Sequence, residues 1–550
     1  MGQPDYFDLG GYARPVTTSS AQAQTWFTRG LLWAYAFNHE EAVTCFEQAI
    51  GADPGCALAH RGLAYALGPN YNKPWEAFDP ADLASSLPRA HAAAAAAGRA
   101  PGAAPVERAL AQAIAARYPA TELAGDGSGW NAGYAGAMRE VYRAHPNDLD
   151  VATLFADALM NLTPWALWDL STGQPAEGTG TVEAKAVLER ALATGEGRAH
   201  PGVLHMYIHL MEMSARPEDA LQAGDLLREL VPDAGHLRHM PTHLDVLCGD
   251  YRSVVSANTA AIAADERFVA RRGAMNFYTL YRAHNYHFKI YGAMFLGQAR
   301  TALAAADQLA AAIPEELLRV ETPPMADWLE GFVPMKMHAL IRFGRWADII
   351  AAPLPADPDL YCVTTAMTRY AKGVACAATG RIGDAEEHRR QFAAAVARVP
   401  ASRTVFNNTC HDILAIAAAM LDGELEYRTG NYDAAFGHLR RAVDLDDGLP
   451  YDEPWGWMQP ARHAYGALLL EQGRVAEAEA VYRADLGLDG TLARACQHPG
   501  NVWSLHGYHE CLTRLGKEEQ AGLIGQQLTI AAAYADTPIE SSCYCRRTVS

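Results

Sequence analysis

The stretch AQTWFTRGLLWAYAFNHEEAVTCFEQAIGADPGC, residues 23–56, decides the fold class of this chain. It predicts a first helix that contains Gly30, a turn at Asn38-His39, and a second helix that ends near Asp53-Pro54. Small residues let two such helices pack closely, and large ones such as Phe46 fill the gap to the next unit. A helix–turn–helix unit of this kind is stable only when further units stack beside it.

The stretch resembles the tetratricopeptide repeat, whose 34-residue consensus has a small residue at position 8, Ala at 20, an aromatic residue at 24, Ala at 27 and Pro at 32. When a turn glycine is set at position 15, later units start at 235, 283, 330, 366, 416, 459 and 502, on the glycines Gly249, Gly297, Gly344, Gly380, Gly430, Gly473 and Gly516. A further unit starts at 201, because Ala220 then occupies position 20. The chain is therefore predicted to be an all-α, tetratricopeptide-like solenoid of helix–turn–helix units.

The spacing of the units is uneven, so we expect four segments. Residues 1–200 are predicted to be repeat-like helices with irregular insertions, and residues 201–300 to be histidine-rich repeat units that form a metal site. Residues 301–535 are predicted to be further repeat units. Residues 536–550 are a tail that contains a C-x-C pair.

The composition and charge of the chain disfavour several classes of binding partner. The formal charge of −18 argues against nucleic-acid binding, which needs a basic surface. The start MGQPDYFDLGG has neither the basic nor the apolar part of a signal peptide, and no apolar run is long enough to cross a membrane. The ten cysteines are mostly scattered in helical context. We therefore expect reduced thiols, a cytoplasmic protein, and no nucleic-acid or membrane partner.

Seven histidines recur at equivalent positions of three successive units. The pair His205 and His239 is separated by 34 residues, as is the pair His209 and His243. All seven fall at positions 2, 5 or 9 of their units, and these are His205, His209, His236, His239, His243, His284 and His287. Residues three, four and seven apart share one side of a helix, so stacked units are expected to bring these side chains together.

In proteins that this chain resembles, positions 2, 5, 9 and 12 of the first helix line a concave groove and contact the ligand. Imidazole ligands suit copper, zinc, iron and nickel. Seven histidines exceed the three or four protein ligands of one ion, so we expect two ions in an open groove. Glu212, at position 12, is predicted to bridge them or to act as a general base.

Three functions fit these residues. The first is an oxidoreductase with a dinuclear copper or iron centre that acts on a small molecule or peptide in the groove. The second is a dizinc hydrolase on the same ligands, with a metal-bound water as nucleophile. The third is a scaffold whose groove binds a peptide without catalysis. The sequence contains no glycine-rich phosphate loop, no G-x-S-x-G elbow and no HExxH motif. Their absence disfavours a nucleotide-binding protein, a serine hydrolase and the common type of metalloprotease.

The tail could complete the metal site. Cys543 and Cys545 stand too close for an easy disulfide and are expected to chelate a soft metal after the tail folds back into the groove. The segment HPGNVWSLHGYHECL (498–512) echoes HPGVLHMYIHLME (200–212). The other histidines at groove positions are expected to lie near the site rather than to bind metal, and these are His338, His463, His506 and His509, with Glu510.

The whole pattern resembles a group of largely uncharacterised bacterial and fungal tetratricopeptide-repeat proteins. The resemblance rests on HPGVLHMYIHLMEMSARPEDAL, AGHLRHMPTHLDVLCGDY and YRAHNYHFKIYGAMFLG, and also on NHEEAVTCFEQAI and GPNYNKPW. It implies an all-α solenoid and no agreed activity, so the function depends on the histidines.

Overall fold

The computed structural model describes residues 6–546 and is mostly helical. The chain divides into two compact units. The first runs up to Leu244 and includes Ala260–Tyr278, and the second contains Asp245–Thr259 and the chain from Thr279 onward. The division falls inside the histidine-rich segment 201–300, and the four segments expected from the sequence stay a prediction.

The first unit is built from short antiparallel helices. They are α1 (Ala21–Tyr35), α2 (His39–Ala52), α3 (Ala57–Ala66), α4 (Pro80–Arg99), α5 (Pro105–Ala115), α6 (Ser128–Ala144), α7 (Leu149–Met160), α8 (Thr181–Leu192), α9 (Pro201–Met211), α10 (Leu221–Leu227) and α11 (Gly235–His239). Short 3-10 turns lie at η1 (Trp75–Ala77), η2 (Gly197–Ala199) and η3 (Pro217–Ala220). Helices α12 (Pro241–Cys248) and α13 (Tyr251–Arg272) contribute residues to both units.

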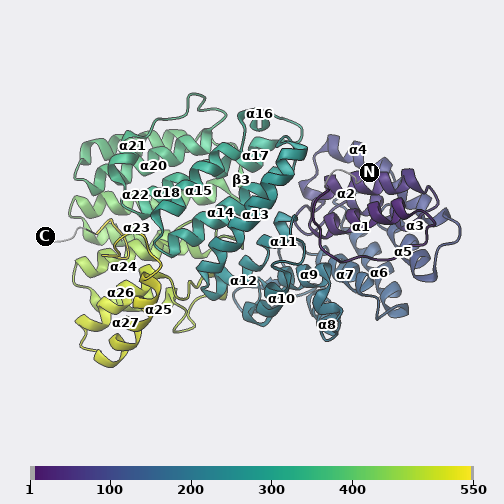
Figure 1. Ribbon diagram of the computed structural model, residues 1–550. Coiled ribbons are helices and arrows are strands. Elements are labelled where there is room, and N and C mark those ends of the chain that lie inside the picture. The colour runs from purple at the N-terminus through teal and green to yellow at the C-terminus, as the bar shows by residue number, and fades with distance from the viewer. Residues whose placement is uncertain (1–5, 547–550) are drawn as a thin grey trace. The chain divides into compact units, whose positions relative to one another are not determined.

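The second unit contains the more regular hairpins, of which α20/α21 and α22/α23 are the clearest in Figure 1. Its helices are α14 (Thr279–Phe295), α15 (Ala299–Ala312), α16 (Glu315–Leu318), α17 (Met325–Leu329), α18 (Met335–Arg342), α19 (Trp346–Ala351), α20 (Cys362–Ala378), α21 (Ile382–Val396), α22 (Cys410–Arg428), α23 (Tyr432–Asp447), α24 (Ala461–Glu471), α25 (Val475–Asp485), α26 (Val502–Arg514) and α27 (Glu518–Ala532). The 3-10 turns are η4 (Glu330–Phe332) and η5 (Arg494–Cys496).

Strands are minor in the described part of the chain. One two-stranded ribbon pairs β1 (Trp168–Asp169) with β2 (Gln174–Pro175), and another pairs β3 (Thr404–Val405) with β4 (Asn408–Thr409), both antiparallel. Among the same residues, no helix is long and apolar enough to span a bilayer. The expected all-α, tetratricopeptide-like class is confirmed.

The hairpin α1/α2 forms for the reasons that its sequence suggests. Ser20 caps α1 by accepting the Ala23 N–H, and Asn38 caps α2 by accepting the Glu41 N–H at 3.2 Å. A Cβ added to Gly30 would lie 2.8 Å from the Phe46 ring, so the predicted small residue is needed for that ring to pack.

The predicted turn glycines are confirmed as a set. Each one ends the first helix of a hairpin with a positive φ between 61° and 86°, a conformation that glycine adopts without steric cost. They are Gly249, Gly297, Gly344, Gly380, Gly430, Gly473 and Gly516. The register taken from the sequence therefore locates these helix turns correctly.

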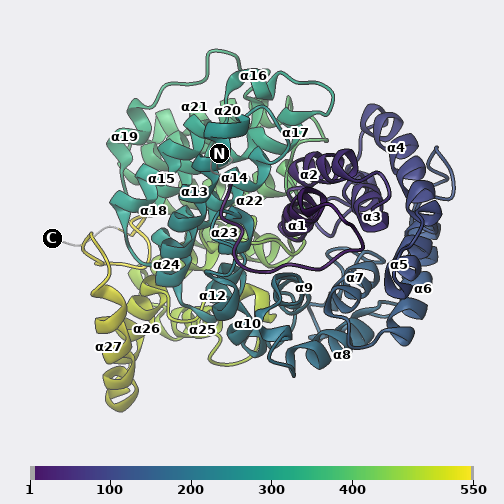
Figure 2. The same ribbon diagram turned by 45° about the vertical axis from the view of Figure 1, so that its right-hand side comes forward.

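Within the first unit, the helices follow one another as a curved array that Figure 2 shows from α3 to α9. Helix α1 also packs against α9, although the two are far apart in the sequence. This long-range contact brings the end of α1 and the turn after it onto the helix that carries His205 and His209.

Candidate metal centre

Six of the predicted site residues lie together in the first unit, and we call them the histidine cluster. Helix α9 carries two of its histidines and ends at Glu212, α11 carries two more, and α12 carries the last. All six side chains are buried, with at most 2% of any residue exposed. The members are His205, His209, Glu212, His236, His239 and His243.

The start of α9 is fixed by its own sequence. His200 caps the helix, because its Nδ1 accepts the Val203 N–H at 3.1 Å, and Pro201 occupies the first helical position. With the helix start fixed, the residues four and seven positions beyond His205 project from the same side. These are His209 and Glu212, so α9 presents three candidate polar groups to α11 and α12.

Three of the imidazoles are oriented by hydrogen bonds from Nδ1. The Nδ1–H of His205 donates to the Tyr35 carbonyl oxygen at 2.7 Å. Those of His209 and His243 donate to the two oxygens of Glu212, at 3.0 and 2.8 Å. Because a carbonyl or carboxylate oxygen only accepts, Nδ1 carries the proton in each ring and Nε2 keeps its lone pair. Metal-binding histidines in proteins are usually held in this way.

The Nε2 atoms face one another. His205 Nε2 lies 3.1 Å from His236 Nε2, and His239 Nε2 lies 2.7 Å from His243 Nε2. His209 Nε2 is buried and has no hydrogen-bond partner. Nitrogen atoms of His205, His209 and His236 all lie within 4.8 Å of one another. Two nitrogens on one tetrahedral zinc-like ion would stand about 3.4 Å apart, so small adjustments suffice for shared coordination.

Three rings of the cluster favour the neutral form. Burial, reinforced by neighbouring histidines, holds the pKa of His205, His209 and His236 well below the ordinary value. Metal ions bind the unprotonated ring nitrogen. These three rings are therefore neutral, and able to bind a metal ion, at neutral pH.

Glu212 has a different geometry from the one expected. It was predicted to bridge two ions or to act as a base, whereas here both of its oxygens accept from histidine Nδ1 atoms. A carboxylate in this position orients two ligands and raises their basicity. Direct coordination by Glu212 stays a prediction.

Aromatic side chains cover the cluster, so the expectation of an open groove is wrong for these residues. Phe37 lies over the rings of three histidines, at centroid distances of 4.6, 5.5 and 5.5 Å from His205, His209 and His236. Tyr71 contacts the His209 ring at 5.1 Å. The cover comes from the α1–α2 turn and the loop after α3, which pack onto α9 in the folded unit.

Neither Phe37 nor the Tyr35 carbonyl was among the site residues predicted from the sequence. Phe37 has a positive φ of 55°, which is strained for a non-glycine residue, as does Trp165 (φ 58°), whose ring lies 6.2 Å from that of His209. Residues held in such conformations often line functional sites. The only sequence signal was their place next to the break at Asn38 and in an irregular segment.

The remaining two predicted histidine ligands belong to the second unit. His284 contacts two aromatic rings. One is that of Phe288 on α14, and the other is that of Phe406, which lies between β3 and β4. His287 lies beside the Phe332 ring, with its Nε2 2.7 Å from the Met458 sulfur. Both are buried, and their roles as metal ligands stay predictions.

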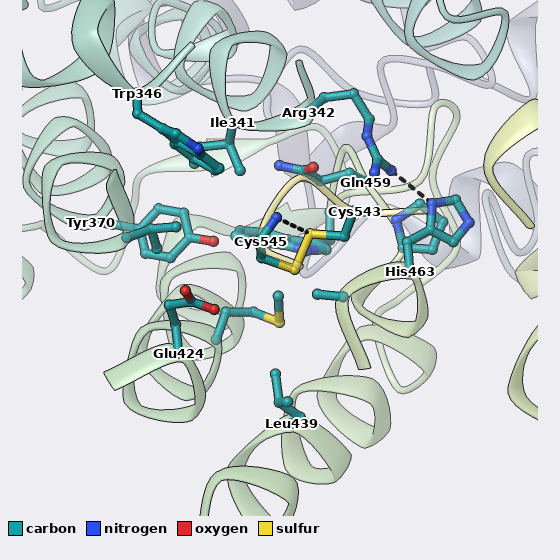
Figure 3. Close-up of a pocket in the computed structure, with 15 residues that line it drawn as sticks. Ile341, Arg342, Trp346, Tyr370, Glu424, Leu439, Gln459, His463, Cys543 and Cys545 are labelled. Carbon is teal, nitrogen blue, oxygen red and sulfur yellow. Dashed lines mark hydrogen bonds between the residues drawn. A yellow bond between two sulfur atoms is a disulfide. The ribbon is translucent and has the colours of Figure 1, made fainter. Parts of the chain in front are cut away.

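The predicted thiolate pair is oxidised in this structure. Cys543 and Cys545 form a disulfide with each other, contrary to the expectation that the C-x-C spacing disfavours one. The tail does fold back, but into a pocket of the second unit lined by side chains of α18, α20, α22 and α24 (Figure 3). Metal binding by these sulfurs would require the reduced form.

The sequence echo between 200–212 and 498–512 corresponds to a repeated buried pair. His200 Nε2 lies 3.2 Å from Asp150, and His498 Nδ1 lies 2.8 Å from Asp485. Asp485 also accepts from His463 Nε2 at 3.0 Å. These histidines therefore belong to carboxylate networks that hold neighbouring helices together, and neither aspartate was predicted from the sequence.

The remaining groove histidines of the second unit are held by local contacts. His338 lies against the Trp457 ring, and His509 lies on α26 beside Glu510, which pairs with Arg546 at 2.6 Å. His506 is largely buried on the same helix, which keeps the pKa of its ring below the ordinary value.

Comparison with known proteins identifies one repeat. Residues 23–56 match the tetratricopeptide repeat. This is the stretch whose two helices pack around Phe46, and the tetratricopeptide match agrees with the hairpin seen there. No curated protein matches the chain.

Three solved structures resemble the chain only weakly. The APC/C hetero-tetramer Cut9-Hcn1 is 13% identical, with 90% of this chain and 78% of that chain covered and a TM-score of 0.30. Yeast Tom70 is 10% identical, with 92% and 99% covered and a TM-score of 0.29. Naa15/Naa10 bound to HypK-THB is 13% identical, with 92% and 70% covered and a TM-score of 0.21.

Proposed function

We propose that this tetratricopeptide-like scaffold carries a transition-metal centre in its first unit. The observation that supports it most is the buried, partnerless Nε2 of His209, which faces His205 and His236 while its Nδ1 is held by Glu212. An unsatisfied buried polar atom is costly, and a bound ion would remove that cost.

The ligand set suggests which ions bind. His205, His209 and His236 supply three imidazoles for one ion, and His239 and His243 supply two ligands for a second. A set of imidazole ligands alone suits copper or zinc. Glu212 accepts hydrogen bonds from two histidine Nδ1 atoms, so we do not count it as a ligand of iron. We therefore favour a dinuclear copper centre of an oxidoreductase, with iron less well matched and a dizinc hydrolase as the alternative.

Burial limits the substrate. The histidines are covered by Phe37 and Tyr71, so a peptide would not reach them without a rearrangement of the covering loops. A small molecule, such as dioxygen, fits this enclosure better. We accordingly propose a small-molecule substrate for the first unit.

Elemental analysis of the protein, produced without an affinity tag and reconstituted separately with copper, zinc and ferrous iron, tests this proposal. We expect near-stoichiometric copper for a dinuclear centre, with the absorption typical of histidine-ligated Cu(II). The variant His209→Gln should lose at least half of the bound ion. The partly exposed His388→Gln is the matched control and should retain it. Absence of all three metals from the parent would refute the centre, and retention of zinc alone would favour the hydrolase.

A protein-binding scaffold without catalysis is the second candidate. It is favoured by the match of residues 23–56 to the tetratricopeptide repeat and by the hairpin architecture of both units. Repeat proteins of this kind present extended binding surfaces. This candidate predicts no stoichiometric metal, so the same elemental analysis separates the two.

A further inference from the structure

The C-terminal segment 537–546 lies in the second unit after its last helix, α27. Its two cysteines complete the wall of a pocket whose other lining residues include Tyr370, Trp457 and His463 (Figure 3). Only about 30 Å³ of space remains beside them. We call the part of the second unit that contacts this segment the tail site.

Two arginines hold the backbone of the segment. Arg342 donates to the Ser542 carbonyl oxygen, and Arg428 donates to that of Cys545. Arg428 also pairs with Glu424 at 2.8 Å, while Arg342 stacks over the Trp503 ring at 4.2 Å and donates to His463 Nδ1. Contacts to backbone carbonyls depend on the path of the peptide backbone and not on its side chains.

Two side chains of the segment fit the tail site specifically. The Ser542 hydroxyl lies between the Tyr482 hydroxyl and the His463 carbonyl oxygen, and the residue is 2% exposed. Four residues later, Arg546 makes two hydrogen bonds to Glu510, at 2.6 and 2.9 Å. The tail site therefore recognises a small hydroxyl residue and an arginine four residues apart.

An empty tail site would leave Arg342 without one of its hydrogen-bond acceptors. Burial lowers the pKa of Arg342 to about 10, and its link to the Asp485 carboxylate runs through His463. Removing the segment would leave this guanidinium without the Ser542 carbonyl, which is costly for a buried charge. A second carbonyl-rich chain would restore the contact.

We propose that the tail site binds a turn-forming peptide segment of a partner protein, with Ser and Arg four residues apart, and that the chain's own residues 537–546, which turn between Cys543 and Arg546, occupy it as a tethered competitor. The tether gives the internal segment a high effective concentration, so a partner must compete with it. The proposal concerns the second unit and is independent of the metal centre.

Full-length variants test the proposal with a fluorescein-labelled synthetic peptide, TPIESSCYCR, closed by its disulfide. Ser542→Trp places a large ring where only a hydroxyl fits and should release the tail. The released variant should bind the peptide at least about tenfold more tightly than the parent in fluorescence anisotropy, because the competitor is gone. Glu540→Ala, at an exposed position of the same segment, is the matched control and should bind like the parent.

Two further measurements keep the test decisive. Arg546→Glu, which repels Glu510 without adding bulk, should also raise peptide affinity if Ser542→Trp fails to fold, as judged by circular dichroism. Adding Glu510→Gln or Arg342→Gln to the released variant should abolish the gain. The proposal is overturned if both tail variants fold and bind the peptide no better than the parent. It is also overturned if adding Arg342→Gln or Glu510→Gln leaves the peptide affinity of the released variant unchanged. Metal content in the same samples should be unchanged, so each proposal fails separately.

Discussion

At the scale of single residues, Glu212 has the largest influence on the proposed metal centre. Its carboxylate is 1% exposed and accepts the Nδ1–H of two histidines from different helices, His209 and His243. One buried side chain therefore fixes the ring orientation of two candidate ligands at once.

The substitution Glu212→Gln should weaken metal binding by about 10- to 100-fold, because the amide offers one acceptor oxygen instead of two and a second shell of this kind contributes that much affinity. Competition with a chelator of known affinity measures the change. Glu189→Gln, on the exposed face of α8, is the matched control and should bind metal like the parent. Equal affinities for Glu212→Gln and the parent would mean that Glu212 does not support the centre.

The buried ring of His463 should make the folding stability depend on pH in the acid range. Burial lowers the pKa of this ring to about 4, and Nδ1 already accepts from Arg342. In the unfolded chain the pKa is about 6.5, so the unfolded state binds the proton first as pH falls. Stability from the neutral ring is thus complete above about pH 6.5 and is lost progressively towards pH 4, by up to about 3 kcal/mol.

Hydrogen exchange of the α24 amides between pH 7 and pH 4.5, corrected for the intrinsic rates, measures this loss. The variant His463→Gln cannot titrate and should show a flatter dependence on pH than the parent. Identical slopes in the two proteins would rule out His463 as the titrating group.

At the scale of helices, close packing around Phe46 holds the first hairpin against α3. A Cβ on Gly62 would stand 2.4 Å from that ring, closer than any real contact. The absence of side chains on α1 and α3 at Gly30 and Gly62 therefore makes room for one aromatic ring on α2.

Gly62→Ala should destabilise the protein by about 1–3 kcal/mol, as overpacking does in well-packed cores. Phe46→Leu in the same chain should recover part of the loss because it frees space beside the new methyl group. Gly98→Ala, on α4 with no atom within 4 Å of the added Cβ, is the control and is expected to be neutral or stabilising by up to about 1 kcal/mol. Urea unfolding followed by circular dichroism measures all three, and a neutral Gly62→Ala would contradict the packing argument.

At the scale of the whole molecule, the proposed metal centre and the tail site lie in different units. A ligand that binds only the folded form stabilises the region that it holds together, by about 2.7 kcal/mol at one hundred times its dissociation constant. Each ligand should therefore protect its own unit.

Addition of copper to the metal-free protein should slow hydrogen exchange in α9 and α11 by about tenfold or more, while the amides of α22 to α27 keep their rates. The His209→Gln variant should show little protection anywhere. Uniform protection of both units, or protection confined to the second unit, would be inconsistent with a centre at the histidine cluster.

The helical class and the turns follow from local features of the amino-acid sequence. Helix caps and turn glycines act over a few residues, so their effects can be read locally, as the positive φ of Gly344 or Gly430 illustrates. The 34-residue spacing also singled out His205, His209, His239 and His243, because equivalent repeat positions face the same way.

The surroundings of these histidines depend instead on contacts that form in the folded chain. The contact of α1 with α9 places Phe37 over the histidines and makes a buried cluster instead of an open groove. Folding likewise directs both oxygens of Glu212 to Nδ1 atoms and seats the C-terminal segment, with its disulfide, against Arg342. These outcomes depend on contacts between residues far apart in the chain, and repeat spacing carries no information about which distant segment covers a given face.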